Sequence, residues 1–329
     1  MVVVEASAGD AVGLGYTYAG KAAGVFIQEV LSQAVTGRDA LDVPACWAAM
    51  ENKVRNHGRP GVASMAISAV DTALWDLKAR LLRLPLAKLL GAARDAVSIY
   101  GSGGFTSYTN SQLASQLQGW VEQGIPQVKM KVGRDPQRDR DRVRVAREAI
   151  GPSARLYVDA NGAYSRKQAL EFADLFHDLG VTWFEEPVSS DDLAGLNLIR
   201  GRCPAGMDIA AGEYGYRSLY FRRMLQAEAV DILQADATRC GATGFLAAGA
   251  LCGARSMPLS AHCAPSLHMH LASAVIPARN IEYFHDHVRI EQMLFDGAVK
   301  PRDGMLYPDF SRPGLGLELK RADAQRYAA

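Results

Sequence analysis

VKMKVG at residues 128–133 opens a series of short apolar segments, each of which ends in an ionisable residue. Five further segments repeat this plan: RLYVDANGAY (155–164), VTWFEEPV (181–188), DIAAGEY (208–214), DILQAD (231–236) and PLSAHCAP (258–265). The ionisable residues follow one another at intervals of 23 to 28 residues, the length of one strand, one crossover helix and two loops. Parallel strands are buried on both faces, so charges belong at their carboxyl ends, where barrel enzymes keep their chemistry. The series therefore predicts an α/β barrel with ionisable residues gathered at one mouth.

The composition is that of an ordinary globular chain. Its 329 residues suffice for a barrel and a smaller domain, and 49% hydrophobic residues can fill both cores. A formal net charge of +1 offers no field to attract nucleic acid or an anionic membrane. The five cysteines form no CxxC pair, which favours reduced thiols and a cytoplasmic location. No apolar run approaches the length of a membrane span, and the start of the chain lacks the features of a signal peptide.

A partial α+β domain is predicted before the barrel, over residues 1–95. It begins with a hairpin from residue 2 to residue 18 around the turn residues Gly9 and Asp10. Apolar residues at helical spacing then predict helices at about residues 21–35, 43–56 and 62–89. Because the last helix carries a long apolar stripe, we expect it to pack between the small domain and the barrel.

The barrel is predicted over residues 96–299. Its first strand begins near Val97, and the helix that follows is expected to be capped by Asn110. The tail, from about residue 300 to residue 329, is expected to return to the small domain.

Three of the strand ends carry carboxylates on successive strands. Asp159, Glu185 and Glu213 offer only oxygen ligands, which select Mg²⁺, with Mn²⁺ as the alternative metal. Without a cation three such carboxylates would repel one another, and the competing interpretation is that each pairs with an arginine or lysine. Glu186 is expected to point to the opposite side if the strand continues past Glu185, so we leave it out of the ligand set.

Two lysines share a face of the strand at 128–133. In an antiparallel sheet the alternation of Lys129 and Lys131 would indicate only a solvated face, but in a barrel this face points inward. A neighbouring cation lowers the pKa of a lysine toward the range of a general base. Lys131, nearer the carboxyl end, is the predicted base, and Lys129 is the residue predicted to tune its pKa.

A histidine and an aspartate end two neighbouring strands. Asp236 can hold one imidazole nitrogen of His262 and present the other to a substrate. A lone histidine would more often be structural. The HMH (268–270) and HDH (285–287) segments suggest a zinc site only weakly, and the glycines of CGATG (240–244) favour a tight turn over an anion site.

The ordered motifs VKMKVG, VDANG, FEEP, AAGE, QAD and SAHCAP resemble those of the enolase superfamily, in its mandelate racemase subgroup. The resemblance covers nearly the whole chain and implies a (β/α)₇β barrel with an α+β capping domain. It implies a Mg²⁺ site, a catalytic base and a His-Asp dyad at Asp159, Glu185, Glu213, Lys131, His262 and Asp236. It further implies that Glu282, in the final strand segment, hydrogen-bonds the substrate carboxylate and that Asn161 contacts substrate.

The shared chemistry implied by the resemblance is removal of the proton α to a carboxylate, with Mg²⁺ stabilising an enediolate. The subgroup is rich in acid-sugar dehydratases, so dehydration of an aldonate or aldarate to a 2-keto-3-deoxy acid is the leading expectation. A 2-hydroxyacid racemase or epimerase is the alternative within enzymes, and a non-catalytic sugar-acid binder is a remote third. The expected partner is a small carboxylate, and we expect a homo-oligomer.

The chain departs from the resemblance at its amino terminus. Members of the superfamily usually begin with another strand and a mobile loop that closes the barrel mouth, whereas this sequence starts directly in VVVEA. We expect such a chain to fold and bind Mg²⁺ but to turn over poorly, with its natural reading frame starting upstream. The alternative is that the short start is native and another element, such as a neighbouring subunit, closes the site.

Overall fold

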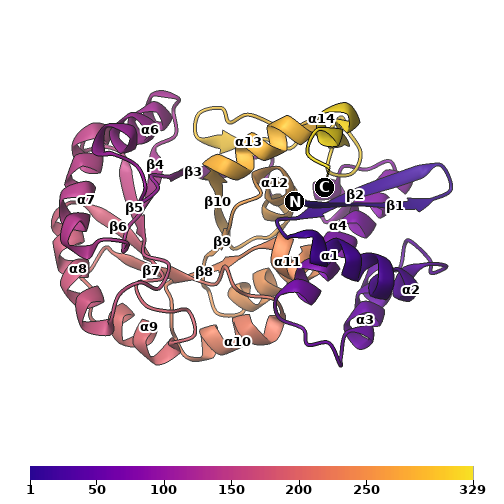
Figure 1. Ribbon diagram of the computed structural model, residues 1–329, viewed down its shortest axis with the longest axis horizontal. Helices are drawn as coiled ribbons and strands as arrows, with labels where there is room; N and C mark the ends of the chain where they lie inside the picture. The colour runs from indigo at the N-terminus through magenta and orange to yellow at the C-terminus, as the bar shows by residue number, and fades with distance from the viewer. Residues whose placement is uncertain (329) are drawn as a thin grey trace.

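Eight parallel strands close into a barrel in the computed structural model, which describes residues 1–328 (Figure 1). The strands are β3 (Val97–Gly103), β4 (Gln127–Lys131), β5 (Arg155–Asp159), β6 (Val181–Glu185), β7 (Asp208–Ala211), β8 (Ile232–Ala235), β9 (Leu259–Ala261) and β10 (Ala278–Phe284). Each pairs with its neighbour in chain order, and the pairing of β10 with β3 closes the ring. The predicted barrel is confirmed.

A helix follows each strand and covers the outside of the barrel (Figure 1). These helices are α6 (Asn110–Glu122), α7 (Pro136–Ile150), α8 (Arg166–Asp178), α9 (Leu193–Arg200), α10 (Ser218–Gln226), α11 (Ala237–Gly253), α12 (Pro265–Ala274) and α13 (His285–Leu294). In α8 the residues at spacings of three and four, Ala169, Phe172, Ala173 and Phe176, are buried against the sheet. The expected cap at Asn110 is wrong by one residue. Thr109 caps α6 in a reciprocal capping box with Gln112, and Asn110 is the first helical residue.

The small domain is a hairpin packed on helices. Its elements are β1 (Val2–Ala8), β2 (Ala11–Thr17), α1 (Lys21–Phe26), the π-helical turn η1 (Ile27–Leu31), α2 (Ser32–Val35), α3 (Val43–Lys53), α4 (Val62–Leu81) and α5 (Leu86–Leu89). Helix α4 contacts both β2 and α11, as predicted. A Cβ at Gly15 would lie 2.1 Å from the Ala69 carbonyl oxygen, so glycine permits the close approach of hairpin and helix.

The predicted helix over residues 62–89 is two helices. The helix breaks after Leu81 because Pro85 has no N–H to donate and restricts the residue before it. Arg83 takes a left-handed conformation in the break, with φ of 55°. The chain thereby turns toward the barrel before β3.

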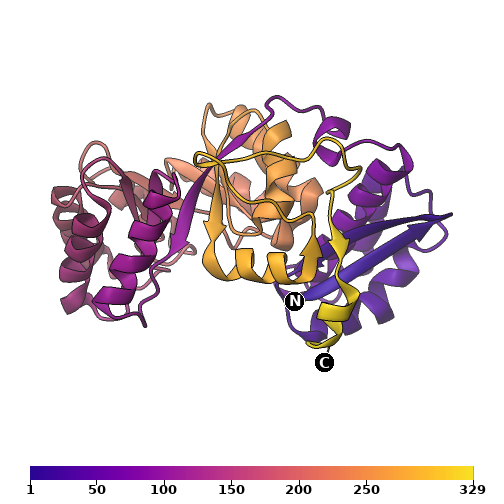
Figure 2. The same cartoon turned by 90° about the horizontal axis from the view of Figure 1, so that it is seen from above.

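The carboxyl-terminal tail lies against the small domain, where α14 is near the start of β1 in Figure 2. Its elements are β11 (Phe295–Asp296), β12 (Met305–Leu306), β13 (Glu318–Leu319) and α14 (Arg321–Gln325). Strand β12 pairs antiparallel with β3, and the Leu86 N–H donates to the Gly314 carbonyl at 2.7 Å. Arg321 pairs with Glu5 of β1 at 2.6 Å.

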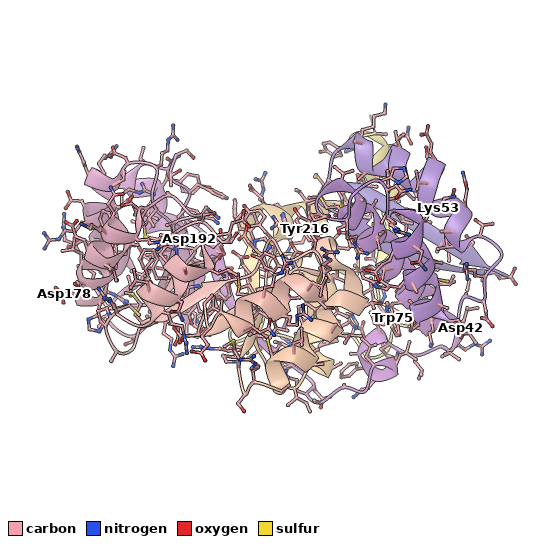
Figure 3. All side chains as sticks on the ribbon, turned by 90° about the horizontal axis from the view of Figure 1, so that it is seen from below. Asp42, Lys53, Trp75, Asp178, Asp192 and Tyr216 are labelled. Atoms are coloured by element: carbon pink, nitrogen blue, oxygen red, sulfur yellow. The ribbon has the colours of Figure 1, made fainter. Side chains whose placement is uncertain are left out.

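The two domains meet along α4 and α11. Helix α11 is kinked at Gly241, where φ is 75°, and a Cβ there would lie 2.7 Å from Asp71 Oδ2. The buried Asp71 carboxylate accepts hydrogen bonds from Thr243 N at 2.9 Å and Thr243 Oγ1 at 2.6 Å. Trp75, labelled in Figure 3, donates its indole N–H to the same threonine at 2.9 Å. The CGATG turn therefore donates hydrogen bonds to a carboxylate of α4, and this contact joins the two domains.

Among the described residues 1–328, none of the helices combines the length and the apolar character that crossing a membrane requires.

Candidate active site

Three carboxylates meet at the carboxyl ends of β5, β6 and β7. The strand register sets Lys131 opposite Asp159 and Asp159 opposite Glu185, and Glu213 follows two residues after β7. One oxygen from each of Asp159, Glu185 and Glu213 lies within 4.8 Å of the others, and all three residues are buried. Glu213 Oε2 accepts no well-aligned hydrogen bond, although His262 Nε2 lies 3.2 Å away. Buried oxygens of this kind fit a hard divalent cation such as Mg²⁺.

Electrostatics support the same interpretation. Burial, and after it the neighbouring Asp159 carboxylate, raises the pKa of Glu185 to about 8. Lys129 offsets part of this repulsion, since its ammonium lies 2.6 Å from Glu185 and 3.8 Å from Asp159. Lys131 pairs with Asp159, and Arg239 lies 3.4 Å from Glu213, so each of the three carboxylates also has a basic neighbour, as the competing interpretation expected. A bound cation would compete with these pairs.

The two lysines of β4 both point into the barrel, but the expected pKa effect is not the net result. Lys131 forms an ion pair with Asp159. Burial and the charge of Lys129 lower the pKa of Lys131, yet the Asp159 carboxylate outweighs them, so its pKa is raised. The same Asp159 oxygens are candidate metal ligands, and the ion pair therefore competes with metal binding. Lys129 is buried deeper, 2.9 Å from Glu282, and neutralises carboxylates on both sides of the barrel.

His262 and Asp236 form a hydrogen-bonded pair across β8 and β9. His262 Nδ1 lies 2.9 Å from Asp236 Oδ2, while Thr238 donates to the other aspartate oxygen from its N–H and hydroxyl at 2.7 Å. Burial would lower the pKa of His262, but Cys263, Glu213, Glu282 and the bond to Asp236 raise it well above its usual value. The imidazole is thus held charged, with Nε2 toward the barrel centre.

Glu282 and Asn161 lie in different surroundings. Glu282 Oε1 accepts from Ser102 Oγ at 2.5 Å, and Glu282 Oε2 accepts from the Cys263 N–H at 3.1 Å. Although burial opposes ionisation, the charges of Lys129 and His262 lower the pKa of Glu282. Asn161 is exposed beside the cluster, where its N–H donates to Asp159 Oδ1 at 2.8 Å. A direct contact between the Asn161 side chain and substrate stays a prediction.

A cavity of about 300 Å³ brings most of these groups together. It is lined by Lys131, Asp236, His262, Glu282, Thr238, Arg239, Cys263, Phe284 and His287 of the barrel and by Thr17, Tyr18 and Met65 of the small domain. Lys131 lies on β4, and His262 follows β9. Going around the barrel, two strands lie between β4 and β9 in one direction and four in the other, so the two residues reach the cavity from different sides. A ligand in this cavity lies between two proton carriers and beside the carboxylate cluster.

No sequence motif predicted the residues that line the cavity from the small domain. The Tyr18 ring stacks on His287, with ring centroids 3.4 Å apart, and its hydroxyl lies 3.4 Å from Glu291. Burial lowers the pKa of His287 to about 3, so this imidazole is a neutral, flat surface. Tyr18 follows the hairpin and Met65 lies on α4, so only the packing of the small domain on the barrel brings them here.

Arg239 is a further residue that the sequence reasoning missed. Its Nη1 donates to the Glu213 carbonyl at 2.8 Å, its Nε lies 3.7 Å from Asp236, and it stacks on the Tyr214 ring at 4.7 Å. Its place three residues after the Asp236 strand end is a signal that could have identified it. The arginine links the metal-ligand side of the site to the dyad.

Glu186 does not continue the strand, so the condition for its pointing to the opposite side is not met. The strand ends at Glu185, and Glu186 turns in a left-handed conformation with φ of 38°. Its side chain is buried, and burial with the Glu213, Asp159 and Glu185 charges raises its pKa to about 9.

The two histidines of the HMH segment, which suggested a zinc site only weakly, interact with backbone groups. His268 Nε2 accepts from the Ala237 N–H at 2.9 Å, and His270 Nε2 lies 3.0 Å from the Leu315 carbonyl.

Comparisons with known families cover most of the chain. Residues 1–91 match the mandelate racemase / muconate lactonizing enzyme N-terminal domain, and residues 112–324 match the enolase C-terminal domain-like family. A crystal structure of a mandelate racemase/muconate lactonizing enzyme-like protein from Rubrobacter xylanophilus is 55% identical, with a TM-score of 0.97 over 99% of this chain and 91% of that one.

Two relatives carry named activities. L-talarate/galactarate dehydratase of Salmonella typhimurium is 33% identical over 93% of this chain and 77% of its own length. Its structure, liganded with Mg and L-lyxarohydroxamate, superposes with a TM-score of 0.89, covering 96% of this chain and 80% of that one at 30% identity. The 3,6-anhydro-alpha-L-galactonate cycloisomerase of Streptomyces coelicolor is 33% identical over 97% of this chain and 88% of its own length.

Proposed function

The chain belongs to the mandelate racemase / muconate lactonizing enzyme family, and on this premise we propose that it is a Mg²⁺-dependent dehydratase of an acid sugar. The observation that carries the proposal is the cavity that Lys131 and His262 share beside Asp159, Glu185 and Glu213. A relative named as a dehydratase, with Mg and a sugar-acid analogue in its structure, supports this choice of reaction and metal.

The three carboxylates would hold the ion. When bound, Mg²⁺ supplies Lewis-acid stabilisation of the substrate carboxylate as negative charge develops on it. Lys131 acts as base only as the neutral amine, so its ion pair with Asp159 opens before the reaction. Its Nζ then takes the proton from the α-carbon, and the electrons of the broken C–H bond become those of a carbon–carbon double bond.

His262 completes the elimination. Its Nε2–H, kept charged through Asp236, protonates the hydroxyl on the β-carbon, which leaves as water. The resulting enol tautomerises to a 2-keto-3-deoxy acid. Glu282 lines the cavity and is held charged by Lys129 behind it, and we propose that Glu282 and Asn161 contact the substrate.

A library of aldonic and aldaric acids tests the proposal. We expect 2-keto acid from at least one member with Mg²⁺ and none after EDTA treatment. Inversion at the α-carbon without keto acid would instead establish a racemase or epimerase. Isomerisation without loss of water, in which a ring oxygen on the β-carbon is the leaving group, would establish a cycloisomerase, the activity named for the relative from Streptomyces.

The same assay in D₂O separates an enzyme from a binder. An enzyme of any of these types exchanges the α-proton for deuterium, whereas a non-catalytic binder leaves the substrate unlabelled. Lys131→Ala serves as the control, because it removes the proposed base while leaving the three carboxylates in place.

We also propose that the protein works in the cytoplasm as a homo-oligomer on a small carboxylate. All five cysteines, which lie within the described residues, are free thiols, and free thiols suit a reducing compartment. Sedimentation of the purified protein measures its state of assembly directly.

A further inference from the structure

Three side chains of different chemistry converge at one edge of the cavity, outside the three-carboxylate cluster. Cys263 Sγ lies 3.3 Å from His262 Nε2 and 3.3 Å from Glu282 Oε2, and the latter two atoms are 3.6 Å apart. Four-coordinate zinc, with bonds of about 2.0 to 2.3 Å, places its ligands roughly 3.3 to 3.6 Å from one another. The three atoms are therefore spaced like one face of a zinc coordination tetrahedron.

Outer partners orient two of the three ligands. Asp236 takes the Nδ1 side of His262, which leaves Nε2 as the free nitrogen, and metal-bound histidines are commonly held by such a carboxylate. Glu282 Oε1 is engaged by Ser102 at 2.5 Å and by Lys129 at 2.9 Å. Oε2 accepts the Cys263 N–H at 3.1 Å and has a second lone pair for a metal.

The third ligand depends on an unusual backbone. Cys263 and Ala264 are consecutive residues in the left-handed region, with φ of 55° and 39°, and neither is glycine. Side chains rarely adopt this conformation without a structural reason. Here it turns the thiol back toward His262 and Glu282, and all three residues line the cavity through which an ion enters.

We propose that His262, Cys263 and Glu282 form a second metal site that binds soft divalent cations, with Zn²⁺ as the best fit, and that this binding inhibits the enzyme. Thiolate and imidazole select Zn²⁺ over Mg²⁺, whereas the cluster of Asp159, Glu185 and Glu213 offers only hard oxygens. On binding, the Cys263 S–H bond and the His262 Nε2–H bond break, both protons pass to solvent, and the freed lone pairs of sulfur and nitrogen form the bonds to zinc.

Inhibition follows from the identity of the nitrogen ligand. His262 Nε2 cannot carry a proton while its lone pair is bound to a metal. Zinc at this site therefore removes the proton carrier on one side of the cavity and leaves Lys131 on the other. Binding itself rests on the ligand geometry alone and is independent of which reaction the enzyme performs.

Binding is tested on the Mg²⁺-loaded protein by titration with Zn²⁺ against a chromophoric chelator. We expect one zinc per chain, and at least about a tenfold loss of zinc affinity in Cys263→Ser. Cys203→Ser is the matched control, because Cys203 Sγ hydrogen-bonds to the Arg200 and Met207 carbonyls and does not line the cavity. The zinc affinity of this variant should equal that of the unaltered protein.

Cobalt gives a readout that needs no activity. With Mg²⁺ present, Co²⁺ should produce a thiolate-to-metal charge-transfer band in the unaltered protein and in Cys203→Ser but not in Cys263→Ser. Far-UV circular dichroism establishes that each variant is folded. Equal zinc affinity in folded Cys263→Ser, absence of the band, or one-for-one displacement of zinc by Mg²⁺ would each overturn the proposal, the last by placing zinc in the carboxylate cluster.

Discussion

The two halves of the barrel mouth hold carboxylates in opposite electrostatic conditions. On the side of β6, burial raises the pKa of Glu185 to about 8 and that of Glu186 to about 9. On the side of β8 and β10, burial is outweighed, and the pKa values of Asp236 and Glu282 are lowered. His262 supplies the largest favourable contribution to Asp236, and Lys129 supplies it to Glu282.

The difference separates a metal half, where the Glu185 and Glu186 charges are disfavoured, from a completed half, where donors stabilise the Asp236 and Glu282 charges. Glu213 lies on the metal side, but His262 lowers its pKa as well. The Asp236 and Glu282 oxygens have donors from Thr238, His262, Ser102 and Lys129. The three-carboxylate side receives lysine charge but has Glu213 Oε2 without an aligned donor. Metal binding and proton transfer should therefore be separable by mutation, and the following experiments test this separation.

Removing a proposed ligand should have the largest effect. Glu185→Gln deletes one of the three charges that would hold Mg²⁺, and loss of Lewis-acid catalysis worth several kcal/mol lowers kcat/KM by about 10³-fold or more. Mg²⁺ should also no longer raise the thermal denaturation midpoint of this variant. Asp208→Asn, at the other end of β7, is a control of equal charge change and should respond to Mg²⁺ normally. An unaltered Mg²⁺ response in Glu185→Gln would contradict the ligand assignment.

The proton carriers come next. His262→Asn and Lys131→Ala should each lower kcat by about 10²- to 10⁴-fold, the usual contribution of a general acid or base. Magnesium binding should persist in both, because neither residue is a proposed ligand, and it should tighten in Lys131→Ala, because the ion pair with Asp159 no longer competes with the metal. Exchange measured in D₂O distinguishes them: Lys131→Ala should lose α-proton exchange, whereas His262→Asn should still exchange the proton while failing to expel water. Loss of Mg²⁺ binding in either variant would argue against the separation of the two halves.

In EDTA, the thermal stability of the protein should depend on pH because of the carboxylates in the metal half. The folded-state pKa of Glu185 is raised to about 8, so the folded protein binds this proton more tightly than the unfolded chain does. Its contribution is fully present below about pH 4.5 and is lost as the pH rises to about 8, so the denaturation midpoint should fall over this interval. Saturating Mg²⁺ should reverse the trend, and Glu185→Gln should make it shallower, with a remainder due to Glu186 and His262, whose pKa values are also raised. A midpoint that rises across this window in the unaltered protein but not in the variant would show the opposite sign.

The smallest effect should come from removing one hydrogen-bond donor in the completed half. Ser102→Ala removes one of the donors to Glu282 but leaves Lys129 in place. Loss of one such hydrogen bond costs about 1 kcal/mol, so we expect a fall in kcat/KM of roughly fivefold, with Mg²⁺ affinity unchanged. Ser98→Ala, at the start of the same strand, provides the comparison. A fall as large as that of His262→Asn would mean that Glu282 depends on Ser102 far more than the geometry indicates.

The sequence by itself determined the barrel and the order of its charged strand ends. This was possible because buried parallel strands exclude charge from their middles, so each ionisable residue after an apolar run marks a carboxyl end. The convergence of Asp159, Glu185 and Glu213, and the pairing of Asp236 with His262, follow from that rule together with strand order. The ends of the helices were predicted less accurately, as the break before Pro85 shows.

Only the tertiary structure decided which other groups join the site and how charge is balanced there. The turn of Glu186 depends on one backbone angle, and the arrival of Tyr18 depends on the hairpin packing through Gly13 and Gly15 against α4. The net pKa of Lys131 depends on competing charges a few ångströms apart, and the Coulomb energy at such distances changes with each contact and with burial. Residue order along a strand encodes which side chains reach the mouth. The distances between them arise from packing of segments far apart in the chain, and those distances set the chemistry.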